Sequence, residues 1–248
     1  NASVLDLLRI DLKKMVNYRT FWVVCGLYFL TLAFVTASGM EILKWLASKG
    51  AEFGAEININ RIPLYHFPDV WQNLLYISGF FKIVIGIMVV ISITNEFTYR
   101  TIRQNVIDGL SRWEFLYSKI LTNFLLSLVS VTMMLIIALV TGIIYSPELV
   151  INDIITDVEF FPAYFLEVFS FLSYALMLGM IVQRSGLTII LLMLSAMIEA
   201  IIKVNLPDSW EPGFAFFPMQ SISNLIEIPF PRYAFQQIQD YVSIQSVI

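Results

Sequence analysis

Three charged side chains stand inside long apolar stretches of this sequence, and they are its first candidates for chemistry. They are Lys82, Glu167 and Glu199. A charge inside a membrane is costly and usually faces protein or water, so such residues mark candidate intramembrane polar sites. The long stem of Lys82 predicts that its charge reaches outward, with a role in the substrate path as the alternative. Glu167 could line the bundle interior, pair with Lys82 or lie near the outer surface. Glu199 stands four residues before Lys203, a spacing that predicts an ion pair on one helix face.

The remaining residue types offer little catalytic or metal chemistry. Cys25 is the single cysteine and His66 the single histidine, and they lie in different segments, so one copy can form neither a disulfide nor a cysteine–histidine metal site. The sequence contains no H-E-x-x-H, G-x-S-x-G or G-x-x-x-x-G-K-[ST] pattern. We expect no catalytic residue, no metal site and no cofactor on this chain. Any ATP would be bound by another chain.

The sequence has five long apolar segments, and the three charged residues lie in three of them. An α-helix rises 1.5 Å per residue, so about 20 apolar residues cross the ~30 Å hydrocarbon layer of a bilayer. Apolar residues make up 58% of the 248 residues, more than a soluble protein of this size can bury. The sequence predicts an all-α, polytopic helical membrane protein with one membrane domain over residues 1–248. The expected spans are residues 21–40, 71–94, 120–145, 160–183 and 185–202.

The distribution of basic residues predicts the orientation of these spans. With the N-terminus inside, nine basic residues fall on the cytoplasmic side and five on the outer side, as the positive-inside rule requires. The outer segments instead collect acidic residues, so the net charge of −4 describes an acidic outer face and gives no reason to expect a nucleic-acid partner. We expect a multi-pass protein of the cell (plasma or inner) membrane with a cytoplasmic N-terminus. The inner basic residues are Arg9, Lys13, Lys14, Arg19, Arg100, Arg103, Arg112, Lys119 and Arg184, and the outer ones are Lys44, Lys49, Arg61, Lys203 and Arg232.

Both ends of the chain lie outside the five segments. Residues 1–19 have an apolar stripe opposite a polar one, which predicts an interfacial helix that enters the bundle as an elbow and contacts membrane lipid. Packing on a soluble partner is the alternative. Residues 203–248 contain five prolines between positions 207 and 231 and no further apolar run, so we expect an outer segment without a span.

The polar stretch at residues 95–119 carries signals for helix ends. Gly109 can end the helix that continues from the second span. Ser111 and Glu114 have the spacing of a capping box, and Leu110 and Phe115 that of the accompanying hydrophobic staple. A new helix should therefore start at Arg112 and run into the third span, with residues 108–110 as the tip of a rigid hairpin. The alternative is a well-capped connection with no further role.

This stretch also resembles the cytoplasmic loop of permease subunits of type-2 ATP-binding-cassette (ABC) transporters. The similarity rests on residues 95–104, which read NEFTYRTIRQ, on residues 110–115, which read LSRWEF, and on Lys119. The family pattern has an acidic residue, a Gly-Thr-Leu/Ile-Arg segment, Ser-Arg-x-Glu and a lysine before the third span. In this chain Arg100 takes the place of the glycine, and the proline often found before the Ser-Arg pair is absent.

The resemblance implies a permease of six spans that pairs with a second permease copy or a related permease and with two cytosolic ABC ATPase subunits, which hold ATP and Mg²⁺. It further implies that the loop couples ATP hydrolysis to transport, usually export. The residues carried over to the coupling loop are Glu96, Arg100, Thr101, Arg103, Asp108, Gly109, Ser111, Arg112 and Glu114. Five spans are visible of the expected six, and since the sequence opens on Asn1, we expect a fragment cut at both ends.

Two other classes of function remain open from the sequence. An intramembrane hydrolase or protease would use Glu167 and Glu199 as paired carboxylates with His66 as a base. A membrane scaffold without transport would share the spans but need no ATPase. The nature of the transported substrate does not follow from these residues.

Overall fold

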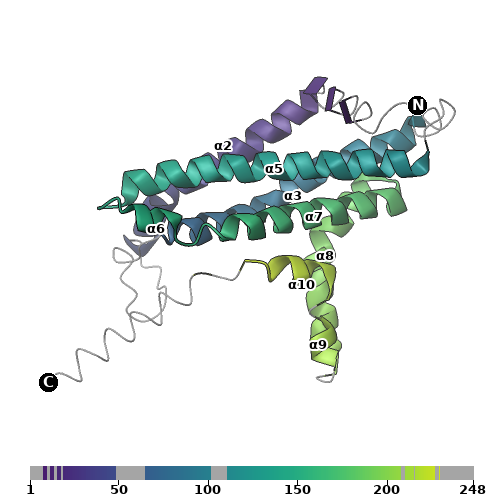
Figure 1. The fold of residues 1–248 in the computed structure, drawn as a ribbon. Coiled ribbons are helices and arrows are strands. Elements are labelled where there is room, and N and C mark those ends of the chain that lie inside the picture. Colours follow the sequence, from purple (N-terminus) through teal and green to yellow (C-terminus); the bar gives the residue numbers. More distant parts are fainter. Residues whose placement is uncertain are drawn as a thin grey trace.

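The computed structural model describes residues 8–9, 12–13, 16–17, 19–48, 65–101, 111–207, 210–214, 216–226 and 229. Within these residues the protein is all-α (Figure 1). Most of the predicted interfacial helix at residues 1–19 lies outside them, as does most of the outer segment at 203–248. The helices are α2 (Arg19–Ser48), α3 (Val70–Thr98), α5 (Arg112–Tyr145), α6 (Ile151–Ile155), α7 (Phe160–Val182), α8 (Ser185–Asn205), α9 (Glu211–Phe214) and α10 (Pro218–Ser223).

In the described part of the chain, four stretches of helix are long and apolar enough to cross a membrane. They are α3, α5, α8 and the stretch Ile151–Val182 that joins α6 to α7. The predicted spans 71–94, 120–145 and 185–202 lie within these stretches, and the predicted span 160–183 extends one residue past Val182. The expected first span, residues 21–40, falls in α2, whose apolar stretch Phe21–Val35 is shorter than the other four. The protein is therefore a multi-pass helical membrane protein with four candidate spans and a shorter apolar helix at its N-terminal side.

Helix α3 forms the centre of the bundle. It packs against α2, α5, α7 and α8, most extensively against α7. Its buried side chains run along its whole length, from Trp71 and Leu74 to Val90 and Ile93. A helix that is apolar all round is suited to such a central place. Helix α3 is thus the one long helix that packs against all four of the others among the described residues.

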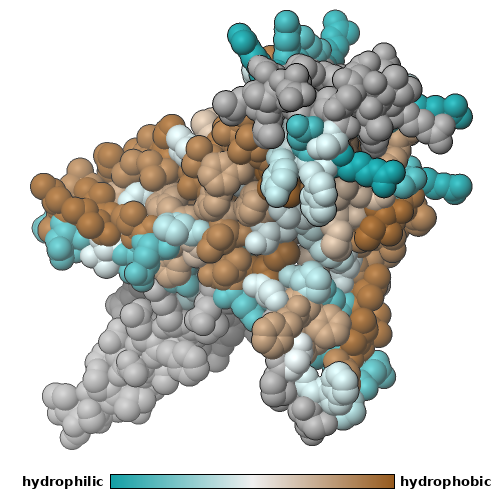
Figure 2. All heavy atoms as spheres, turned by 45° about the vertical axis from the view of Figure 1, so that its right-hand side comes forward, coloured by the Kyte–Doolittle hydropathy of each residue, from teal (hydrophilic) through white to brown (hydrophobic). Residues whose placement is uncertain are grey.

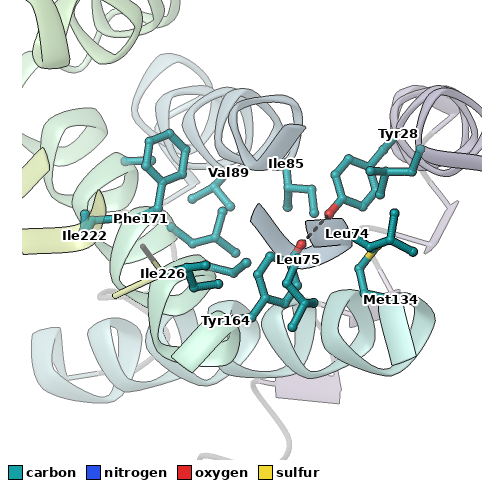
Figure 3. Packing of buried hydrophobic residues seen from close by; sticks show 14 of the residues in the cluster. Tyr28, Leu74, Leu75, Ile85, Val89, Met134, Tyr164, Phe171, Ile222 and Ile226 are labelled. Carbon is teal, nitrogen blue, oxygen red and sulfur yellow. Dashed lines mark hydrogen bonds between the residues drawn. The ribbon is translucent and has the colours of Figure 1, made fainter. Parts of the chain in front are cut away.

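Three hydroxyl groups join α2, α5 and α7 in the core. The Tyr28 hydroxyl lies 2.9 Å from the Ser130 Oγ and 3.1 Å from the Tyr164 hydroxyl. Figure 3 shows the two tyrosines pointing at each other among apolar side chains. A hydroxyl buried away from water needs a partner, so the three groups satisfy one another and fix the contact between their helices.

Large apolar side chains cover much of the outer surface of the helices (Figure 2). Leu30 of α2, Ile144 of α5 and Ile181 of α7 are each about 70% exposed. Hydrophilic side chains instead gather at the end of the bundle where α5 begins. An apolar surface with a polar end is expected of helices whose solvent is lipid.

Helix α8 runs across the other long helices instead of along them (Figure 1). The chain turns sharply at Gln183, which has a left-handed φ of 57°, and α8 starts two residues later. As a result α8 buries only a few side chains, among them Leu192 and Ser195, and exposes an apolar face. This crossing makes room for a cavity beside α3 and α7.

Candidate functional site

A cavity of about 380 Å³ lies between α3, α7, α8 and α10. The structure brings the three predicted intramembrane residues, Lys82, Glu167 and Glu199, into its wall, although they come from three different helices. Apolar and aromatic side chains make up most of the remaining wall. These include Phe80, Phe171, Met193, Phe214 and Ile226.

Lys82 and Glu167 form an ion pair across α3 and α7. Both side chains are largely buried, with exposed fractions of 13% and 7%. Lys82 therefore turns inward to Glu167, and the prediction that it reaches the outer surface is wrong. Its Nζ also lies 5.5 Å from the centre of the Phe171 ring, a cation–π contact. The second oxygen of Glu167, Oε2, is buried without a hydrogen-bond partner among the described residues.

A glycine makes room for this ion pair. A Cβ added at Gly79, one helical turn before Lys82, would lie 2.8 Å from the Glu167 Oε1. Real Cβ atoms do not approach that closely, so any larger residue at position 79 would displace the carboxylate. The close approach of α3 and α7 at Gly79 thus positions the pair.

Glu199 binds backbone groups, and the predicted ion pair with Lys203 is absent from the described residues. Its two carboxylate oxygens accept hydrogen bonds of 3.0 Å from the backbone N–H groups of Met219 and Gln220, at the start of α10. The first N–H groups of a helix lack partners within the helix and carry partial positive charge, so a carboxylate is a favourable partner. The Lys203 Nζ lies instead 5.2 Å from the centre of the Phe214 ring.

The second candidate site lies at the end of the bundle where α3 ends and α5 begins. Helix α3 ends at Thr98, about ten residues before Gly109, so the prediction that Gly109 ends this helix is wrong. Arg100 follows with a left-handed φ of 57°, the conformation that commonly ends a helix. The sequence did not reveal this end because arginine is rare in that conformation. Arg103, Asp108, Gly109 and the predicted partner of the staple, Leu110, lie outside the described residues.

The predicted capping box at the start of α5 is confirmed. The backbone N–H of Glu114 donates to the Ser111 Oγ at 3.2 Å, and the Ser111 N–H donates to the Glu114 Oε2 at 2.8 Å. Helix α5 starts at Arg112 and continues without a break to Tyr145. Its 34 residues measure about 51 Å at 1.5 Å each, longer than the ~30 Å hydrocarbon layer, so the capping box projects beyond it. There the backbone N–H of Ser111 lowers the pKa of the Glu114 carboxyl below its ordinary value.

An ion pair that the sequence did not predict joins the two ends of this loop. The Lys119 Nζ of α5 donates to the Glu96 Oε1 of α3 at 2.5 Å, and both side chains are about nine-tenths buried. The Thr101 hydroxyl donates to the Glu96 carbonyl at 3.2 Å and ties the residue after the turn back to α3. Sequence reasoning named Glu96 and Lys119 separately. Their opposite charges at the two ends of one hairpin were the signal that could have paired them.

Comparison with known protein families places the sequence in one of them. Residues 56–239 match the family described as "protein of unknown function (DUF2705)". The chain belongs to this family. The match spans both candidate sites of the DUF2705 chain, from Lys82 to Glu199 and from Glu96 to Lys119. A comparison with curated proteins found no match.

Proposed function

We propose that this multi-pass DUF2705 protein is the permease subunit of an ABC transporter. In this role it provides the path for the substrate, and a separate cytosolic ATPase subunit, carrying ATP and Mg²⁺, drives transport in the direction of export. A second permease copy or a related permease completes the complex. The N-terminus and the loop between α3 and α5 face the cytoplasm of a cell membrane.

The observation that carries the proposal is the buried Glu96–Lys119 ion pair. It clamps the end of α3 to the start of α5, so these two helix ends are held together as one unit. Lys82 stands in the cavity wall on the same helix as Glu96, 14 residues earlier or about 21 Å along the axis. A displacement of the loop by an ATPase would therefore be transmitted along α3 to the cavity.

The backbone at Arg100 also supports the proposal. The resemblance to type-2 permeases places a glycine at this position, and glycine takes a positive φ at little cost. Arg100 has a φ of 57°, so the chain keeps the backbone conformation for which glycine is suited although the residue differs. The coupling residues in this account are Glu96, Arg100, Thr101, Arg103, Asp108, Gly109, Ser111, Arg112 and Glu114.

The proposal is tested by co-purification from native membranes. A tagged full-length chain should bring down a soluble chain that hydrolyses ATP. Replacing residues 108–111 with Gly-Ser repeats should remove that chain, whereas the same replacement of residues 151–154 in α6, at the opposite end of the bundle, should leave it bound. Purification of the intact chain without an ATPase, or equal ATPase recovery with both replacements, would contradict the proposal.

The intramembrane hydrolase is the second candidate because Glu167 and Glu199 line one cavity. Both carboxylates are already engaged, Glu167 by Lys82 and Glu199 by two backbone N–H groups, and His66 is not among the lining residues. A double variant, Glu167→Gln with Glu199→Gln, separates the two functions. Loss of a cleavage activity with transport intact would favour the hydrolase. A scaffold, in contrast, would co-purify with no ATPase at all.

A further inference from the structure

Among the described residues, four charged side chains line the cavity, and three of them are bound by other groups of the protein. Lys82 and Glu167 neutralise each other. The charge of Glu199 is offset by the two backbone N–H groups at the start of α10. Lys203 is different, because among the described residues no carboxylate lies within ion-pair distance of it and its Nζ faces the Phe214 ring. The four formal charges sum to zero, and the exposed ammonium group of Lys203 is the one among them that is without a direct partner of opposite charge or a hydrogen bond in the described part of the chain.

The rest of the wall is suited to an aliphatic chain. Tyr76, Phe80, Phe171 and Leu192 line the part of the cavity between α3, α7 and α8. The cavity volume of about 380 Å³ is in the lower part of the ~300–1,000 Å³ range of small-molecule sites. A ligand with one acyl chain fits this size better than a lipid with two.

The cavity also has an opening to the apolar surface. Phe80 of α3 and Met193 of α8 both line it, yet they are 66% and 58% exposed. A molecule dissolved in the surrounding lipid would meet these side chains first. Helix α10 forms another side of the wall, and its first backbone N–H groups are bound by Glu199. Ile222 of α10 packs into the core, and Figure 3 shows it with Ile226 beside α7.

From these observations we infer that the cavity binds a single-chain amphiphile with an anionic head group. The head group pairs with Lys203, and the acyl chain lies among the aromatic side chains of α3 and α7. Entry occurs from the lipid, past Phe80 and Met193. This binding site belongs to the chain itself and does not depend on an ATPase partner.

The test uses the purified full chain in phosphatidylcholine nanodiscs and a photoactivatable lysophosphatidylglycerol. Labelling should be saturable and map to the helices that line the cavity, α3, α7, α8 and α10. Lys203→Gln should weaken binding about fivefold, the size expected for loss of one partly exposed ion pair, and Lys203→Arg should restore it. Arg184→Gln is the matched control, because Arg184 is an exposed cation at the other end of α8 that does not line the cavity.

Two further arms define the ligand. A monoacylglycerol probe with the same acyl chain, which lacks the anion, should label about fivefold more weakly and be insensitive to Lys203→Gln. Inorganic phosphate should not compete with the lysophosphatidylglycerol probe, because it lacks the chain. Equal labelling by both probes, an unchanged Lys203→Gln variant, or full competition by inorganic phosphate would each overturn the inference. Because no ATPase is present, these results are independent of the co-purification test.

Discussion

At the scale of single residues, the charged groups within the apolar segments are each held by a specific contact. Lys82 pairs with Glu167, Glu199 binds the N–H groups of α10, and Lys203 lies over an aromatic ring. The sequence identified three of these residues as the polar sites of the membrane interior, but it could not choose their partners. The partner of Glu199 is a backbone that lies about twenty residues away along the chain, and no side-chain spacing indicates it.

The first prediction concerns Gly79. Gly79→Ala should place a methyl group against the Glu167 carboxylate and separate it from Lys82, lowering the free energy of unfolding by about 1–3 kcal/mol. Gly26→Ala in α2 is the control: a Cβ there meets nothing within 4 Å, so this variant should be neutral or more stable by about 0.5–1 kcal/mol. Thermal unfolding in detergent micelles measures both. Equal melting temperatures would show that α3 and α7 do not approach closely at Gly79.

The second prediction concerns the left-handed residue after α3. Arg100→Gly should raise the free energy of unfolding by about 0.5–1 kcal/mol, because it removes a conformational cost of ~1–2 kcal/mol and adds some chain entropy to the unfolded state. Thr98→Gly, two residues earlier at the last residue of α3, should instead lower it by about 0.5–1 kcal/mol, because Thr98 has a helical backbone and its hydroxyl donates to the Thr94 carbonyl. If both variants are destabilised alike, Arg100 does not have a positive φ in the folded protein.

At the scale of helices, sequence signals predicted a helix end correctly where the contacts that determine it lie within a few residues. The capping box at Ser111 and Glu114 satisfies backbone groups within four residues, so the start of α5 was predicted to the residue. The end of α3 was placed too late because Gly109 was the obvious helix terminator, whereas the chain ends α3 with a conformation that arginine rarely adopts. The Glu96–Lys119 pair depends on two helices lying side by side, so the signals for helix ends do not indicate it, and only the opposite charges at the two ends of the hairpin could have.

A third prediction tests whether this ion pair joins the two helices. Glu96→Gln and Lys119→Gln should each destabilise the protein by about 3–5 kcal/mol, since each leaves a buried charge without its partner. The double variant should cost clearly less than the sum, because two neutral amides can hydrogen-bond to each other. Chemical unfolding of the four proteins in micelles gives the coupling free energy. Additive effects of the two substitutions would mean that no pair exists and that the loop is not clamped.

At the scale of the whole molecule, hydropathy was sufficient to predict an all-α membrane protein but not the arrangement of its helices. The direction of α8 follows from a two-residue connection in which Gln183 has a left-handed backbone conformation. Amino-acid composition does not indicate this direction. The cavity exists because α8 crosses the bundle and α10 closes one side of the space that this leaves. The sequence could therefore indicate the charged residues of the site, but not that they line one cavity.

The central claim, that the loop between α3 and α5 faces the cytoplasm and binds an ATPase, can be tested directly by cysteine labelling. Cys25 is the single cysteine, so Cys25→Ser gives a background in which Gly109→Cys or Asn152→Cys is the one reactive thiol. We predict that a membrane-impermeant maleimide labels Asn152→Cys in intact cells. It labels Gly109→Cys only after the membrane is opened, and less when the ATPase is bound. Labelling of Gly109→Cys from outside intact cells would contradict the topology and the proposed transporter function together.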